Sequence, residues 1–98
     1  MRFKLHSAAR AEFLEAISRY EEAVPGLGGR FLVEFERSIR LLPNAPTIGV
    51  PFGSRLRRFV LNDHFPYSIV YAVRDDLIVV VAVAHGLRRP GYWMRRRA

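Results

Sequence analysis

The chain has 98 residues, of which half are apolar, and carries a formal net charge of +7. This length corresponds to one domain, which we place at residues 1–98, and the apolar fraction excludes an intrinsically disordered chain. The lack of cysteine excludes disulfides and thiolate metal sites, and the lack of a signal peptide or of an apolar run of about 20 residues predicts a cytoplasmic protein without membrane contact.

The first residues predict a strand followed by a helix. Residues 2–6 alternate polar and apolar side chains, as in a half-buried strand. Ser7 is of a residue type preferred at helix N-caps. Apolar residues then recur at spacings of three and four over residues 8–23, with charged side chains that include Glu12 on the outward face. This pattern indicates an amphipathic helix, which Pro25 and the glycine after it end.

A second helix is predicted to pack against the first. Its apolar residues repeat at helical spacing and are Phe31, Phe35, Ile39 and Leu42. The glycine-rich residues 26–29 are expected to form the turn before it, and a turn this short makes the two helices an antiparallel hairpin. The helix is expected to end at Pro43, because residues 43–53 hold three prolines and two glycines, which predicts a loop.

Three closely spaced strands are predicted in the second half. They cover residues 55–61, 67–73 and 77–84, and the turn-prone triplets Asn62-Asp63-His64 and Arg74-Asp75-Asp76 connect them into an antiparallel meander. The last strand is apolar on both faces, so we expect it to be central, with helices on one side and the tail, a partner or both on the other. The predicted fold is α+β: an N-terminal strand, a helical hairpin on one face of the sheet, and the meander.

The sequence predicts neither a metal site nor an organic cofactor. Its three histidines, His6, His64 and His85, lack the short spacing that directs two ligands to one ion. It also has no nucleophile elbow, phosphate-binding loop or dinucleotide-binding glycine motif.

A basic and aromatic set of residues in the second half is the candidate site. Residues 52–98 hold nine basic and three acidic side chains and so supply +6 of the +7, which favours a polyanionic or acidic partner. The set, which we expect to meet at one end of the sheet, consists of Arg55, Arg57, Arg58, His85, Arg88, Arg89, Tyr92, Trp93 and Arg95 to Arg97. Its side chains are of the kinds that RNA cleavage by the 2′-hydroxyl requires: proton donors and acceptors, and cations at phosphorus.

Several of these residues have a structural alternative. His85 titrates near neutral pH and suits acid–base chemistry, but a histidine at a strand end also serves as a structural hydrogen-bonding group. Tyr92 and Trp93 can stack on nucleobases, or Trp93 can fold back over the sheet. The arginines at 95–97 can form a solvated tail.

Several motifs together resemble the RelE/ParE superfamily of toxins from bacterial type II toxin-antitoxin operons. They are PGLGGRF at 25–31, Pro46 and Gly49 in the loop, LRRF at 56–59, FPYSIVY at 65–71 and VAVAHGLRRPGYW at 81–93. The resemblance spans nearly the whole chain, and the combination of the last two motifs is specific.

The resemblance implies a compact toxin that a cognate antitoxin holds inactive in a hetero-oligomer. The antitoxin is expected to be acidic or partly disordered and to bind operator DNA through its other end. The superfamily divides in its target: RelE-like members cut mRNA in the ribosome, whereas ParE-like members inhibit DNA gyrase without a known catalytic residue.

In the ribonuclease interpretation, Arg58 binds a phosphate from its strand and Arg88 is the cation supplied by the C-terminal tail. Tyr92 lies near the scissile phosphate, and His85 is the fourth catalytic candidate. For either target, the residues expected to contact the target or a nucleic acid are Arg55, Arg57, Arg89, Trp93, Arg95 and Arg96. Gly86 departs from the ribonucleases, which tend to have a basic side chain there, and a lysine-rich central strand is missing. These departures favour a gyrase inhibitor. The alternatives are a ribosome-dependent mRNA endoribonuclease and a degenerate member that only binds its antitoxin.

Overall fold

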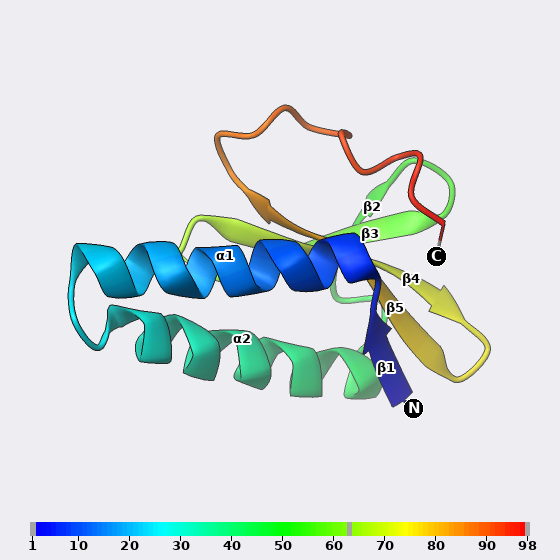
Figure 1. The fold of residues 1–98 in the computed structure, drawn as a ribbon. Helices are drawn as coiled ribbons and strands as arrows, with labels where there is room; N and C mark the ends of the chain where they lie inside the picture. The colour runs from blue at the N-terminus through cyan, green and yellow to red at the C-terminus, as the bar shows by residue number, and fades with distance from the viewer. Residues whose placement is uncertain (1, 63, 98) are drawn as a thin grey trace.

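The computed structural model describes residues 2–62 and 64–97, which form two helices and a five-stranded sheet (Figure 1). In chain order the elements are β1 (Arg2–Leu5), α1 (Ser7–Ala23), α2 (Leu27–Asn44), β2 (Val50–Phe52), β3 (Leu56–Val60), β4 (Tyr67–Arg74) and β5 (Leu77–His85). Asp63 of the predicted turn lies outside the described residues. No helix in the described part of the chain is long and apolar enough to cross a membrane.

The predicted α+β fold is confirmed, and the sheet is mixed. Its strand order is β1-β5-β4-β3-β2, with β1 parallel to β5 and all other neighbours antiparallel. The apolar β5 is therefore internal, as its sequence predicts. Val70 pairs with Ala82 but Tyr71 pairs with Val80, so Val81 is an extra residue that forms a β-bulge in β5.

The two faces of the sheet are covered by different parts of the chain. On one face lie α1 and α2, side by side in Figure 1, and their core includes Phe31, Ile69 and Tyr71. On the other face, Trp93 packs with Val70 and the residues around it in a second apolar cluster. The C-terminal segment, residues 86–97, is therefore the second cover of the sheet.

The beginning of α1 differs from the prediction. The helix begins at Ser7 itself, and the N-cap is His6, whose Nδ1 accepts a hydrogen bond from the Ala8 N–H at 3.0 Å. The prediction of Ser7 as N-cap was wrong by one residue, because an imidazole nitrogen is the acceptor here.

The glycine-rich segment lies mostly inside α2. Gly26, with a φ of 89°, is the N-cap, whereas Gly28 and Gly29 are helical, so the predicted turn over all four residues was wrong. A Cβ on Gly28 would lie 2.7 Å from the Ile17 carbonyl oxygen, so glycine there permits close contact between the helices. The Glu21 carboxylate accepts hydrogen bonds from the N–H groups of Gly26 and Gly28, at 2.9 and 3.0 Å.

The proline-rich connection is also more regular than predicted. Helix α2 includes Pro43 and ends at Asn44, so only its last turn loses a backbone hydrogen bond. The short strand β2, which contains Pro51, was missed. Proline is tolerated there because β2 is at the edge of the sheet, where one side of its backbone needs no partner strand.

Candidate functional site

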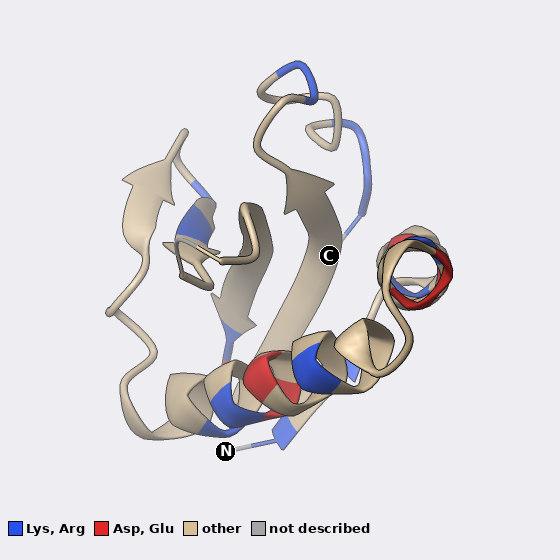
Figure 2. Ribbon diagram, turned by 90° about the vertical axis from the view of Figure 1, so that its left-hand side faces the viewer, with Lys and Arg blue, Asp and Glu red and all other residues tan. Residues whose placement is uncertain are grey.

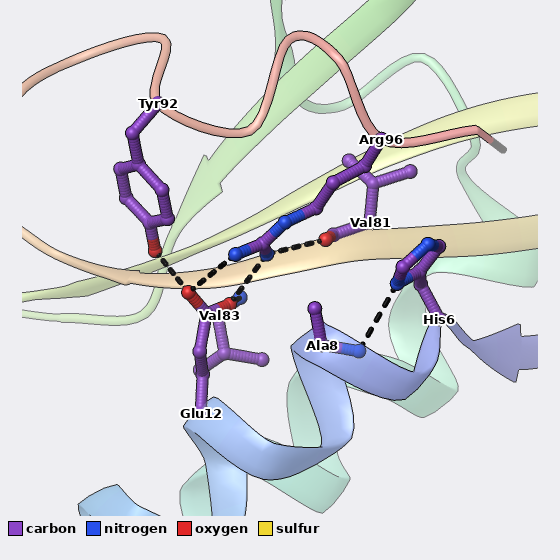
Figure 3. A network of polar contacts seen from close by, with 7 residues as sticks. All are labelled: His6, Ala8, Glu12, Val81, Val83, Tyr92 and Arg96. Atoms are coloured by element: carbon purple, nitrogen blue, oxygen red, sulfur yellow. Dashed lines mark hydrogen bonds and ion pairs between the residues drawn. The ribbon is translucent and has the colours of Figure 1, made fainter.

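Glu12 of α1 lies at the centre of a polar network that fastens the C-terminal segment to the fold (Figure 3). Arg96 donates hydrogen bonds to both carboxylate oxygens, from Nη1 to Oε1 at 2.9 Å and from Nη2 to Oε2 at 3.1 Å. The Tyr92 hydroxyl donates to Oε2 at 2.5 Å. The side chains of Arg96 and Glu12 are only 20% and 15% exposed, so this ion pair is largely removed from water.

The same two side chains complete one edge of β5. Strand β1 ends at Leu5, opposite Val80, and no described strand continues along β5 on that side. The Val83 N–H donates to Glu12 Oε1 at 3.0 Å, and the Val81 carbonyl accepts from Arg96 Nη1 at 2.9 Å. The side chains of Glu12 and Arg96 therefore pair backbone groups that a neighbouring strand would otherwise pair.

The network changes the proton affinity of its members. Burial by itself raises the pKa of Glu12, but the hydrogen bonds from Arg96, Tyr92 and the Val83 N–H outweigh burial and leave the pKa below its ordinary value. Burial, and then the hydrogen bond to Glu12, raise the pKa of the Tyr92 phenol. Tyr92 is therefore protonated at neutral pH, with its proton directed at a carboxylate.

Three of the four candidate catalytic residues meet in a hollow of about 180 Å³ on the sheet face that the C-terminal segment covers. Arg58 comes from β3, His85 from the end of β5 and Arg88 from the C-terminal segment. The remaining lining residues are Val60, Pro66, Ser68, Ala84, Gly86, Pro90 and Trp93. Tyr92 is not among them, so the predicted catalytic set is only partly assembled.

The local contacts of His85 and Arg88 orient both side chains. His85 Nδ1 accepts a hydrogen bond from the Leu87 N–H at 3.0 Å, so a neutral ring carries its proton on Nε2. The guanidinium carbon of Arg88 lies 4.0 Å from the centroid of the Tyr92 ring, in a cation–π contact.

Trp93 is only 2% exposed and packs against Phe52, with 5.3 Å between ring centroids. This arrangement matches the structural alternative for Trp93, since neither face of the indole is open to a nucleobase. Its Nε1 has no hydrogen-bond partner among the described residues.

The remaining predicted contact residues do not all meet at one end of the sheet. Arg55 lies in the turn before β3, outside the strand in which it was predicted. Strand β3 runs from Arg55 toward Val60, and Val60 lies at the end of the sheet where His85 is found. At about 3.3 Å per residue, Arg55 is ~17 Å from Val60 along the strand. The expected convergence was therefore wrong for Arg55.

Two further arginines are used inside the fold, and two are exposed. Arg57 donates to the carbonyl oxygens of Thr47 and Gly49, at 3.1 and 2.8 Å, and so braces the loop before β2. Arg96 is the partner of Glu12, whereas Arg89 and Arg95 are exposed on the C-terminal segment.

Sequence reasoning missed Glu12, which was assigned to the outward face of α1. The local signal, an acidic residue on a helix, is shared by Glu15 and Glu22, and the partners of Glu12 lie 80 and 84 positions away. The described residues contain no group of His, Asp or Glu arranged to hold a metal ion.

Comparison with known proteins identifies the family of the chain. The family model described as the ParE toxin of the type II toxin-antitoxin system, parDE, matches residues 3–90. Toxin ParE2 of Mycobacterium tuberculosis, strains H37Rv and CDC 1551, is 29% identical over 90 residues, which cover 91% of this chain and 85% of the relative. A structure of the chromosomal ParDE system from P. aeruginosa has the same fold, with a TM-score of 0.72 at 16% identity over 87% of this chain and 95% of that one. The chain therefore belongs to the ParE toxin family of type II toxin-antitoxin systems.

Proposed function

We propose that this toxin inhibits DNA gyrase by binding and not by cleaving RNA. The observation that carries the proposal is the position of Tyr92. Its hydroxyl donates to Glu12, and it does not line the hollow that Arg58, His85 and Arg88 share. A ribonuclease would need the hydroxyl of the late tyrosine at the scissile phosphate, whereas the Tyr92 hydroxyl is bound to Glu12 even though its ring stacks on Arg88.

Gly86 supports the same proposal. Its N–H donates to the Pro66 carbonyl oxygen at 2.6 Å, and a Cβ on Gly86 would lie 3.3 Å from that oxygen. A side chain here, such as the basic one that RelE-like ribonucleases tend to have, would require the Pro66 carbonyl to shift by a few tenths of an ångström, so glycine fits the backbone as it stands.

The proposal includes a cognate antitoxin that neutralises the toxin in the cytoplasm. The similar P. aeruginosa structure is of a ParDE toxin-antitoxin system, and the family is that of the toxins of such systems. Because residues 52–98 supply +6 of the net charge, an acidic, partly disordered partner with a DNA-binding end is the best complement.

The test is supercoiling of relaxed plasmid by purified gyrase, with increasing amounts of the toxin. We expect supercoiling to stop, and to be restored when the antitoxin encoded by the neighbouring gene is added first. Normal supercoiling at saturating toxin, in a preparation that binds the antitoxin, would contradict the proposal.

A ribosome-dependent mRNA endoribonuclease is the second candidate, favoured by the convergence of Arg58, His85 and Arg88 in one hollow. It predicts cleavage of mRNA on translating ribosomes, slowed about 100-fold or more by His85→Ala. Running this assay beside the gyrase assay separates the two functions, and intact mRNA at saturating toxin rules out the second.

A further inference from the structure

We propose that the hollow between β3, β5 and the C-terminal segment binds one phosphate group of a DNA backbone. The inference rests on the proposed function, because gyrase itself binds DNA, so a protein that inhibits it by binding can contact that DNA. It gives the toxin a non-catalytic DNA contact at a defined place, lined by Arg58, His85, Arg88 and Trp93.

The charged groups that line the hollow are all cations, and Arg88 and His85 also border a neighbouring hollow that Glu12 and Glu15 line. Neither Arg58 nor Arg88 forms an ion pair with any described residue, and no Asp or Glu is among the lining residues. The flat face of the Arg88 guanidinium stacks on the Tyr92 ring. The N–H groups at the edge of the guanidinium remain free to donate hydrogen bonds. Two guanidinium groups of this kind match the oxygens of a phosphate.

His85 adds a neutral hydrogen-bond donor to the hollow. It carries its proton on Nε2 when neutral, because Nδ1 is occupied by the Leu87 N–H. Trp93 contributes an apolar wall, because its residue is 2% exposed and its Nε1 is buried without contact to solvent or to a partner among the described residues.

The size of the hollow and the surrounding charge favour a backbone phosphate. Its volume of about 180 Å³ is below the range of roughly 300 Å³ and more that holds a drug-sized ligand, so it suits a single small group. Arg89 and Arg95 are exposed on the same segment and form no ion pair with the described residues. In Figure 2, Lys and Arg mark the C-terminal segment, whereas the Asp and Glu visible in that view lie on the helices. A repeating polyanion matches this extended distribution better than one carboxylate.

Trp93 is the only tryptophan in the chain, so its fluorescence reports on the hollow directly. We expect inorganic phosphate and a short DNA duplex each to change its emission in a saturable way, with the duplex effective at lower concentration. Binding of the same duplex, labelled with a fluorophore, is then measured by anisotropy over a series of salt concentrations.

Arg58→Gln and Arg88→Gln test the two cations, with Arg40→Gln on α2 as a control that removes the same charge from the other side of the sheet. Each of the first two should weaken duplex binding about tenfold or more. Each should also lower the slope of log affinity against log salt by about 1, as the loss of one phosphate contact requires. Arg40→Gln should leave the slope unchanged.

Two more variants keep the test independent of folding. Arg58→Lys retains the charge but not the paired donors, and should lie between wild type and Arg58→Gln in affinity. Trp93→Phe removes part of the ring that lines the hollow and should weaken duplex binding, while Phe52→Leu, which changes a neighbour of Trp93, should not. Thermal unfolding of every variant shows that the comparison is between folded proteins.

The outcomes separate this inference from the proposed function. Equal salt slopes for Arg58→Gln, Arg88→Gln and Arg40→Gln would overturn the phosphate site even if the toxin inhibits gyrase. Emission that responds to a glutamate-rich peptide but not to phosphate or DNA would overturn it also, in favour of a protein carboxylate. The expected slopes in a toxin that leaves gyrase unaffected would support the site and contradict the proposed function.

Discussion

Arg96 and Glu12 form a bidentate ion pair between residues 84 positions apart in the chain. The pair joins α1 to the C-terminal segment and at the same time closes the edge of β5. Because Trp93 precedes Arg96 by three residues and covers the second apolar cluster, the pair also holds one wall of the phosphate hollow in place.

Glu12→Gln should destabilise the fold by roughly 2–4 kcal/mol, because it leaves the guanidinium of Arg96 partly buried without its counter-ion. The amide keeps the size of the side chain, so the loss is electrostatic and not a packing defect. Urea unfolding at neutral pH measures the change.

Glu15→Gln is the matched control on the same helix. Glu15 pairs with Arg19 at 2.9 Å, but the two side chains are 63% and 71% exposed, so we expect a change within about 0.5 kcal/mol. Equal effects of the two substitutions would show that the network around Glu12 contributes no more than a surface ion pair.

The ion pair also predicts how stability depends on pH. The folded-state pKa of Glu12 lies below its ordinary value. The contribution of Glu12 to the free energy of unfolding is therefore complete above the unfolded-state pKa of about 4.3, and it is lost as the pH falls through the folded-state pKa. The difference in unfolding free energy between wild type and Glu12→Gln should therefore shrink in acid. Unfolding curves at neutral pH and at about pH 3 test this, and a constant difference would exclude a lowered pKa for Glu12.

Local patterns were sufficient for most elements of the fold. The helical spacing of Phe31 and Phe35, and the apolar run of β5, predicted both helices and the internal strand to within a few residues. Such patterns report which face of an element is buried, and burial dominates the choice of secondary structure.

The errors occurred where tertiary contacts override local preference. Gly28 suggested a turn but is needed for helix contact, and Pro51 suggested a loop but lies in an edge strand. In the candidate site, composition identified Arg58, His85 and Arg88 as basic residues that act together. It did not predict that Arg57 and Arg96 serve the fold, since their partners are carbonyl groups and a carboxylate distant in sequence.

Tyr71→Phe should cost about 1–3 kcal/mol of stability, because two hydrogen bonds to the loop before β2 depend on its hydroxyl. The hydroxyl donates to the Pro46 carbonyl oxygen at 2.8 Å and accepts from the Gly49 N–H at 3.0 Å. Tyr20→Phe is the control, since the Tyr20 hydroxyl makes no hydrogen bond to the described residues. Thermal unfolding should separate the two variants, and equal stability would mean that the loop does not depend on Tyr71.

Two adjacent glycines in α2 give opposite predictions for the same substitution. A Cβ on Gly28 would lie 2.7 Å from the Ile17 carbonyl oxygen and 3.0 Å from the Glu21 Cβ, so Gly28→Ala forces the helices apart and should destabilise the fold by about 1–3 kcal/mol. A Cβ on Gly29 meets nothing within 4 Å, so Gly29→Ala should stabilise the protein by about 0.5–1 kcal/mol, the usual difference in helix propensity. Urea unfolding of both variants measures the signs. Stabilisation by both would show that α1 and α2 can separate at Gly28 without loss, and that the close contact there is not required for the fold.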